Sequence, residues 1–339
     1  MAKKYNIAIV GATGAVGTAM IDILEESSLP IGNLFFVASE RSKNKVIKFR
    51  GSDQDVYSIE DFDFKKIDIA MFSAGAEISE KYVPIATKSN TIVIDNTSQY
   101  RYEDNIPLIV PEVNANVIPE YKNTGIIANP NCSTIQMLVA IKPIHDVSKI
   151  LRINVSTYQA VSGTGNEAID ELNNQIKSYV GGNKIVNTVY PEQIAFNVIP
   201  HCDVFMENGY TKEEMKMVWE TKKILDNDID VNATAVRVPV FFGHSESVHL
   251  ELEKKLKKSD ALDLLRNSSN ILKVFDESGE KQYPTSIDSE NSNFVYVGRV
   301  REDISIDNGI NMWVVANNIR KGAAYNSIQI AEILIAKYL

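Results

Sequence analysis

The sequence predicts an α/β protein in two parts: a parallel-sheet domain, then a second domain of α+β type with a mixed sheet. In the first 130 residues, short apolar runs alternate with helix-like segments, the pattern that builds a parallel sheet. Beyond residue 150, strands with alternating apolar and polar residues appear, and we expect the last two strands to pair antiparallel. A chain of 339 residues also exceeds what a single core usually supports.

The composition restricts the class of partner. A hydrophobic fraction of 44% and a charged fraction of 23% are typical of soluble globular proteins. A net charge of −9 argues against general nucleic-acid binding. Two cysteines make no disulfide framework, which favours a reducing compartment. With no signal-peptide pattern and no apolar stretch long enough to span a bilayer, we expect a cytoplasmic protein without a membrane partner.

The first strand leads into a glycine-rich turn. Residues 7–10 form a short apolar run, residues 11–17 follow with the spacing G-x-x-G-x-x-G, and an amphipathic helix continues to Leu24. A strand, a glycine turn and a helix are the context of a Rossmann-like dinucleotide site, where backbone N–H groups approach a pyrophosphate. The alternative is a tight turn with close helix–strand packing. The cofactor-binding candidates here are Gly11, Thr13, Gly14, Ala15 and Val16.

The end of the second strand, residues 34–38, bears on cofactor choice. An NAD site would place an acidic residue there to hold the ribose hydroxyls. The chain instead has Ser39, Arg41 and Ser42, which can surround a 2′-phosphate and so favour NADP. Glu40 is the competing residue, because it can reach a ribose. A solvated charged turn is the remaining alternative.

Two further strands are predicted at residues 67–75 and 91–96, with a helix at residues 77–89 between them. Both strands end in small or polar residues, including the cofactor candidate Ser73, and the carboxyl edge of such a sheet faces the ligand. Arg101 follows as an anion clamp or an ordinary surface arginine. From this segment alone the surface alternative is favoured.

A single cysteine lies at the next strand-to-helix junction. An apolar run at residues 125–128 precedes residues 129–134, and a helix-like pattern follows in which Asn131 or Ser133 can serve as the N-cap. Cys132 is therefore expected at or near a helix N-terminus, where a thiol ionises more easily and can act as a nucleophile. The alternative is a small buried apolar side chain.

The second domain begins with a half-exposed strand at residues 151–161. Gln159 lies near its end, before a glycine-containing loop at residues 162–166, and a helix is expected at residues 167–180. A glutamine at that position can hold a substrate carbonyl, and the loop can let a cofactor approach. An ordinary connecting loop is the alternative.

A capped helix is predicted at residues 211–225, followed by a strand at residues 236–240 that carries Arg237. Glu220 and Lys223 share a face of this helix, and taken alone they form a surface ion pair of little energetic value. Residues 294–301 and 309–316 are the last two strands.

His244 is a candidate acid/base group, because glycine and serine rather than core residues flank it. An exposed loop histidine is the alternative. His201, Cys202 and His249 match no zinc spacing, so we predict no metal site and interpret Cys202 as structural.

The final helix, residues 322–339, is expected to pack back on the nucleotide domain. This gives two predicted domains: an NADP-binding Rossmann-like domain of residues 1–130 completed by residues 322–339, and a catalytic/dimerisation domain of residues 131–321.

Taken together and in order, these motifs resemble aspartate-semialdehyde dehydrogenases along nearly the whole chain. The motifs that carry the resemblance are residues 11–17, 41–42, 110–114, 129–134, 159–163, 220–223, 237–240, 243–246 and 321–324. The resemblance implies NADP-dependent conversion of 4-phospho-L-aspartate to L-aspartate 4-semialdehyde and phosphate, in the diaminopimelate pathway to lysine, threonine and methionine. It also implies a homodimer formed through the second domain, or a dimer of dimers.

The resemblance also assigns roles to individual residues. Cys132 would be the nucleophile that forms an acyl-thioester, His244 the general acid/base, and Gln159 the residue that orients the thioester. The implied substrate and phosphate ligands are Arg237 for the α-carboxylate, Glu220 for the amino group, Arg101 and Lys223 for phosphate, and Asn131 beside the cysteine. Ser162, Gly163 and Asn318 would line the cofactor site.

Departures from the family pattern are few. Asn44 stands where a glycine is usual, and asparagine tolerates the left-handed backbone that such a position needs. Asn317 stands where an aspartate is common, and residues 96–100 replace a serine pair and a phenylalanine with similar groups.

Two other functions remain open at this point. An N-acetyl-γ-glutamyl-phosphate reductase shares the chemistry, but its cysteine usually follows Pro-Gly, whereas Asn131 precedes Cys132 here. A non-catalytic NADP-binding sensor would be indifferent to Cys132→Ala. The presence of Cys132 together with Gln159, Arg237 and His244 argues against the sensor.

Overall fold

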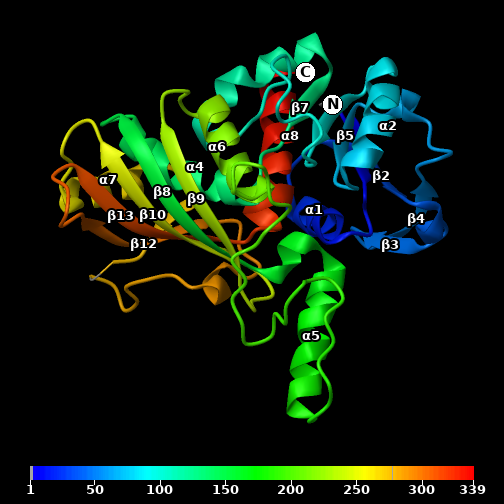
Figure 1. Ribbon diagram of the computed structural model, residues 1–339. Coiled ribbons are helices and arrows are strands. Elements are labelled where there is room, and N and C mark those ends of the chain that lie inside the picture. Colours follow the sequence, from blue (N-terminus) through cyan, green and yellow to red (C-terminus); the bar gives the residue numbers. More distant parts are fainter. Residues whose placement is uncertain (1–2, 277) are drawn as a thin grey trace. The chain divides into compact units, whose positions relative to one another are not determined.

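The computed structural model describes residues 3–276 and 278–339 (Figure 1). The chain divides into two compact units, each with its own sheet. The first unit comprises Met1–Asn131 and Ala323–Leu339, and the second comprises Cys132–Gly322. The α/β class with a parallel-dominated sheet and a second, mixed sheet is confirmed.

The sheet of the first unit has the strand order β3-β4-β2-β1-β5-β6-β7. All its pairs are parallel except β3 with β4, which pair antiparallel at one edge. The strands are β1 (Tyr5–Val10), β2 (Ile31–Ala38), β3 (Val46–Phe49), β4 (Ser52–Ser58), β5 (Ile69–Phe72), β6 (Ile92–Asp95) and β7 (Ile126–Ala128). Because β1 and β5 are parallel neighbours, their carboxyl ends lie side by side, which brings the glycine turn next to Ser73.

The helices of the first unit are α1 (Ala15–Glu26), α2 (Ala76–Lys88), α3 (Pro111–Asn114) and α8 (Tyr325–Tyr338), with 3₁₀ segments η1 (Glu40–Ser42), η2 (Phe64–Lys66) and η3 (Ala115–Asn123). The C-terminal α8 is joined to this unit by a buried amide: Asn326 Nδ2 donates to Asn129 Oδ1 at 2.7 Å and to the carbonyl of Ile109 at 3.0 Å. The predicted final helix starts later than expected, because the π-helical turn η6 (Arg320–Ala324) precedes it.

The sheet of the second unit has the order β11-β12-β13-β10-β8-β9. Its strands are β8 (Ile150–Gln159), β9 (Asp230–Arg237), β10 (His244–Leu252), β11 (Leu272–Val274), β12 (Val295–Glu302) and β13 (Gly309–Ala316). β12 and β13 pair antiparallel as predicted, while β8 and β9 are parallel. The strand that carries Arg237 ends at that residue instead of spanning 236–240, since Pro239 has no N–H for a sheet ladder.

The helices of this unit are α4 (Cys132–His145), α5 (Asn166–Val180), α6 (Lys212–Ile224) and α7 (Lys258–Ser268), with 3₁₀ turns η4 (Val161–Thr164) and η5 (Ser286–Ser289). α6 begins with a capping box, in which Thr211 and Glu214 satisfy each other's backbone N–H groups, as the sequence predicts. α4 is buried on nearly every side from Ser133 to Ile141, which is more than a single apolar face.

One backbone conformation and two absences complete the description of the fold. Asn44 has φ 67°, a left-handed conformation that asparagine tolerates. Within residues 3–276 and 278–339, no helix has both the length and the apolar character needed to cross a bilayer. The same residues contain no cluster of three or more His, Cys, Asp or Glu side chains arranged to hold a metal ion.

Candidate active site

The turn between β1 and α1 leaves no room for side chains at two of its glycines. Gly11 has φ +94°, and a Cβ there would lie 2.9 Å from the backbone carbon of Ser73. A Cβ on Gly17 would lie 2.2 Å from the carbonyl oxygen of Gly11. Gly14 is the N-cap of α1 and brings no side chain to the first N–H groups of the helix. The turn therefore exposes backbone donors to a phosphate, and it fits a dinucleotide cofactor.

The loop after β2 adds hydroxyl groups to this turn. The Oγ atoms of Thr13 and Ser42 are 3.5 Å apart, so the loop and the glycine turn are adjacent. Glu40 pairs with Lys43 at 3.2 Å, and the Ser58 hydroxyl and Lys43 lower the pKa of its carboxyl. Arg41 is exposed on the same 3₁₀ turn. Glu40, the residue that competes for a ribose, thus has a cation partner in its own loop.

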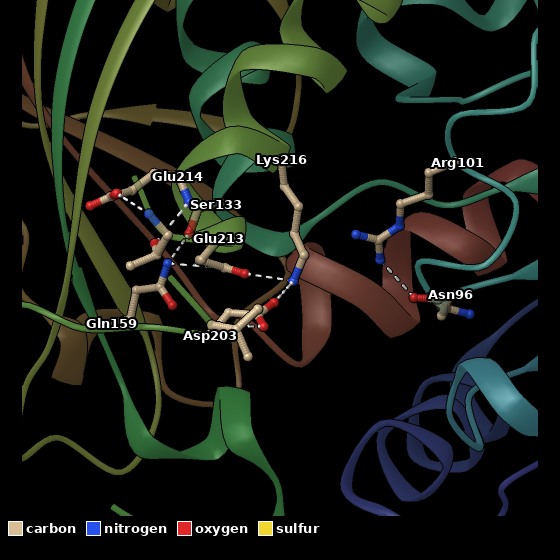
Figure 2. Close-up of polar contacts among 10 residues, drawn as sticks. Asn96, Arg101, Ser133, Gln159, Asp203, Glu213, Glu214 and Lys216 are labelled. Carbon is tan, nitrogen blue, oxygen red and sulfur yellow. Dashed lines mark hydrogen bonds and ion pairs between the residues drawn. The ribbon is translucent and has the colours of Figure 1, made fainter. Parts of the chain in front are cut away.

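Arg101 is buried in the first unit, so the surface interpretation of this residue is wrong. Its Nη2 donates to the carbonyl of Asn96 at 2.7 Å (Figure 2). Nearby, the Asp95 carboxyl accepts from the hydroxyls of Ser79 at 2.9 Å and Thr97 at 2.8 Å. Burial raises the pKa of Asp95, while these hydrogen bonds and Arg101 oppose the rise. Asn131 is also buried, at the end of the same unit.

In the second unit, one edge of the sheet gathers three predicted site residues. Gln159 and Arg237 are register partners at the ends of the parallel strands β8 and β9. Arg237 Nη1 donates to the carbonyl of Ala160 at 2.7 Å, and the Ala160 N–H donates to His244 Nδ1 at 3.0 Å. The arginine and the histidine therefore contact the backbone of one residue, Ala160, which follows Gln159.

His244 is completely buried as the first residue of β10, so the exposed-loop interpretation is wrong. Because Nδ1 accepts a backbone N–H, the neutral ring carries its proton on Nε2. Among the described residues Nε2 has no hydrogen-bond partner. Burial lowers the pKa of His244 to about 3, with Arg237 adding to the effect and Glu213 opposing it.

Gly163 packs against two of these side chains. A Cβ at this position would lie 3.3 Å from His244 Nε2 and 3.1 Å from Arg237 Nη1. Any side chain at residue 163 would therefore crowd the two groups that face it. Beside it, Asn318 Nδ2 donates to Ser162 Oγ at 3.0 Å and Asn318 Oδ1 accepts from the N–H of Gly243 at 3.0 Å.

Cys132 is the first residue of α4, at the helix N-terminus that the sequence predicts. It is partly exposed. Its neighbour Ser133 accepts a hydrogen bond from Gln159 Nε2 at 2.9 Å, which links the start of α4 to the sheet edge. A Cβ on Gly322 would lie 2.8 Å from Cys132 Cβ, so the cysteine packs directly against that glycine. The other thiol, Cys202, is buried, and burial raises its pKa to about 11.

Glu220 and Lys223 lie on α6 as predicted, but Glu220 has no exposed surface. The pair is therefore not the solvated surface feature that their spacing alone suggests. Lys223 belongs to the second unit and Arg101 to the first.

Sequence reasoning missed a group of polar residues next to Gln159. Glu213, on α6, accepts a hydrogen bond from Gln159 Nε2 at 3.2 Å. Lys216 in turn donates to Glu213 and to Asp203. The sequence does show Glu213 and Lys216 at i, i+3 spacing, but Glu220 and Lys223 have the same spacing. The spacing alone does not predict which strand the helix packs against.

Comparison with known families matches both parts of the chain. Residues 6–121 match the semialdehyde dehydrogenase NAD binding domain, and residues 141–321 match the semialdehyde dehydrogenase dimerisation domain. The aspartate-semialdehyde dehydrogenase of Shewanella violacea is 54% identical over 340 residues, covering 100% of both chains. The chain belongs to the aspartate-semialdehyde dehydrogenase family.

Solved structures of aspartate-semialdehyde dehydrogenases agree with this assignment. The Vibrio cholerae aspartate semialdehyde dehydrogenase II, complexed with ASA, superposes with a TM-score of 0.97 at 51% identity and 100% coverage of both chains. A Candida albicans aspartate semialdehyde dehydrogenase with NADP gives a TM-score of 0.78 at 25% identity, with 99% of both chains covered.

The family resemblance inferred from the sequence is confirmed. As a member of the aspartate-semialdehyde dehydrogenase family, the chain is an oxidoreductase that acts on an aldehyde and uses a nicotinamide cofactor. The glycine turn described above is the feature of this structure that fits such a cofactor.

Proposed function

We propose that the chain interconverts 4-phospho-L-aspartate and L-aspartate 4-semialdehyde, with NADP as the cofactor and inorganic phosphate as the second product. The observation that supports this most is the position of Cys132. It begins α4, next to the serine that Gln159 contacts, at the sheet edge that also carries Arg237 and His244. The helix N-terminus stabilises a thiolate there.

In the biosynthetic direction the Cys132 thiolate attacks the acyl carbon of the acyl phosphate. A C–S bond forms, the C–O bond to phosphate breaks, and phosphate leaves with the electron pair. The nicotinamide cofactor, when bound, supplies the hydride that reduces the acyl group. Breaking the C–S bond then releases the aldehyde and returns the electron pair to Cys132. The covalent step is useful because a thioester accepts hydride far more readily than a carboxylate does.

For His244 the hydrogen bonds favour the donor part of the predicted acid/base role. The Ala160 N–H occupies Nδ1, so Nε2–H is the group that can stabilise negative charge developing on sulfur or oxygen. A base at Nε2 would first need that proton removed. The low pKa keeps the ring neutral at physiological pH and leaves this donor in place.

Charge supports the proposed substrate contacts. Arg237 is the proposed ligand of the α-carboxylate and Glu220 that of the α-ammonium, and both are buried, where a charged ligand is held more strongly than in water. Arg101, Lys223 and Asn131 are the proposed ligands of phosphate. These assignments rest on the family resemblance and on side-chain chemistry.

The preference for NADP over NAD rests on the loop after β2. Arg41 and the hydroxyls of Ser39 and Ser42 can meet a 2′-phosphate, and the Glu40–Lys43 ion pair reduces the competition from Glu40. The Candida albicans relative was solved with NADP. Gly11, Thr13, Gly14, Ala15, Val16, Ser73, Ser162, Gly163 and Asn318 complete the proposed cofactor set.

We also propose that the second unit forms a homodimer. It matches a dimerisation domain. Between residues 179 and 205 it also exposes a set of large apolar side chains, whose contact with water is unfavourable. They are Tyr179, Val180, Val186, Phe196, Val198, Val204 and Phe205, each at least 60% exposed. Sedimentation of the wild type and of Phe205→Asp tests this, with a shift toward monomer expected in the variant.

The deciding assay follows NADPH absorbance with L-aspartate semialdehyde, NADP and phosphate. We expect phosphate-dependent activity in the wild type, a loss of about 10⁴-fold or more in Cys132→Ala, and retained activity in the control Cys202→Ala. Activity that survives in Cys132→Ala would sink the thioester mechanism. Activity only with N-acetylglutamate semialdehyde would favour the related reductase, and NADP binding without turnover would favour a sensor.

A further inference from the structure

In the second unit, a series of charged side chains joined by hydrogen bonds leads to Gln159 (Figure 2). Asp203 Oδ2 accepts from Lys216 Nζ at 2.7 Å, and the same Nζ donates to Glu213 Oε2 at 2.9 Å. The other oxygen of Glu213 accepts from Gln159 Nε2 at 3.2 Å. Gln159 is 1% exposed and Glu213 is 7% exposed, so solvent hardly competes for the contact between these two residues.

The carboxylate determines which end of the Gln159 amide points where. A carboxylate only accepts hydrogen bonds, so the end of the amide that faces Glu213 must be the nitrogen. The second N–H of that nitrogen goes to Ser133 Oγ at 2.9 Å. Both donors of the amide are thereby used, and its carbonyl oxygen is the end that remains to meet a ligand. Ser133 follows Cys132 in α4, so the fixed amide contacts the residue after the proposed nucleophile.

Lys216 forms ion pairs with Glu213 and Asp203. Burial by itself would lower the pKa of Lys216, but Glu213 and Asp203 raise it above its usual value. A mostly buried ammonium between two carboxylates is stable only as part of such a group, because an unpaired buried charge is costly. Glu213 also acts to raise the pKa of His244, against the larger lowering by burial and Arg237. Glu213 therefore interacts with two of the proposed site residues.

We infer that Glu213 and Lys216 are positioning residues for the thioester chemistry, which hold the Gln159 amide in one of its two orientations. The inference rests on the proposed function and adds residues to which the sequence assigned no role. In Glu213→Gln the new amide can donate as well as accept, so both orientations of Gln159 become possible. Lys216→Met removes the ammonium group that contacts Glu213.

The first test compares steady-state kinetics. We expect Glu213→Gln and Lys216→Met to lower kcat by roughly tenfold while KM changes much less, since substrate charges are not touched. The matched control is Lys149→Met, because Lys149 also lies between two carboxylates, Asp226 at 3.2 Å and Asp228 at 2.8 Å, in the same unit. Thermal midpoints identify any variant that fails to fold. An unchanged kcat in folded Glu213→Gln would overturn the inference.

A double-mutant comparison separates positioning from a general structural effect. In a Gln159→Ala background, Glu213→Gln should cause no further loss of kcat, because the amide it positions is gone. An equal loss in both backgrounds would overturn the inference.

A measurement without substrate keeps this inference distinguishable from the proposed function. The side-chain amide protons of Gln159, assigned by their absence in Gln159→Ala, should exchange slowly with water in the wild type and at least about tenfold faster in Glu213→Gln. Equal exchange would overturn the inference whatever the substrate is. A wild type active only on another semialdehyde would overturn the proposed function alone, and the kcat comparison is then made with that substrate.

Discussion

The proposed site residues of the two units are built by different means. In the first unit the proposed cofactor turn consists of backbone and small side chains, and the absence of a Cβ at Gly11 and Gly17 shapes it. In the second unit the sheet edge consists of long polar side chains, Gln159, Arg237 and His244, that are buried and held by hydrogen bonds. A backbone site depends on which residue is small, whereas a side-chain site depends on what each polar group contacts.

The difference predicts different responses to mutation. A change in the backbone turn should act on folding and cofactor affinity, because there is no space to relax into. A change in the side-chain network should act on turnover, because the fold survives but the geometry of the reacting groups does not.

The largest effect is expected for Gly17→Ala in the first unit. The new Cβ would lie 2.2 Å from the Gly11 carbonyl oxygen, so β1 and α1 must separate. We expect a loss of about 3 kcal/mol in the free energy of unfolding, measured by denaturant titration. Gly51→Ala is the control, because a Cβ there meets nothing within 4 Å and only the positive φ opposes it. Equal stability of the two variants would break the comparison.

Gly322→Ala tests the second unit. Its Cβ would lie 2.8 Å from Cys132 Cβ and displace this proposed nucleophile. We expect kcat to fall by roughly 10- to 100-fold, with a thermal midpoint close to that of the wild type. A variant with normal kcat would show that the position of Cys132 is less constrained than its packing indicates.

His244→Gln should change how stability depends on pH. The folded pKa of about 3 lies below the unfolded value of 6.5, so between these values the unfolded chain binds the additional proton and acid favours unfolding. Between about pH 7.5 and about pH 5 the wild type should lose about 2 kcal/mol more stability than the variant. Denaturant titrations at the two pH values measure this, and equal losses would contradict the burial of a neutral ring.

Arg41→Ala should produce the smallest change. Removal of one cation from a 2′-phosphate should raise the KM for NADPH by roughly tenfold and leave the KM for NADH unchanged. Lys45→Ala, another exposed cation of the same loop, is the control. Similar effects on both cofactors would show that the loop after β2 does not select NADP.

Much of the fold could be predicted, because alternating apolar runs and glycine turns specify a parallel sheet locally. The helices and strands that escaped prediction were α3, β3, β4, β10, β11 and α7. β4 is largely polar and pairs with β3 at the edge of its sheet, so neither carries the apolar signal of a central strand. α7 follows Lys257, which makes no side-chain cap, so its start gives no signal either.

The candidate site was predictable by position but not by environment. Local motifs placed Cys132 at a helix N-terminus and Gln159 at the end of a strand. The burial of Arg101, Glu220 and His244 depends on segments distant in the sequence, so spacing alone gave exposed alternatives for all three. The contact of Glu213 with Gln159 joins residues 54 positions apart, and no local pattern encodes it.

The contrast between the two thiols has a practical consequence for counting functional molecules. Cys202 is buried with a pKa of about 11, whereas Cys132 is partly exposed at a helix N-terminus. Near neutral pH an alkylating reagent should therefore modify one cysteine per chain while the fold is intact. The amount of label incorporated would then report the concentration of competent nucleophile, and a second equivalent would report unfolding.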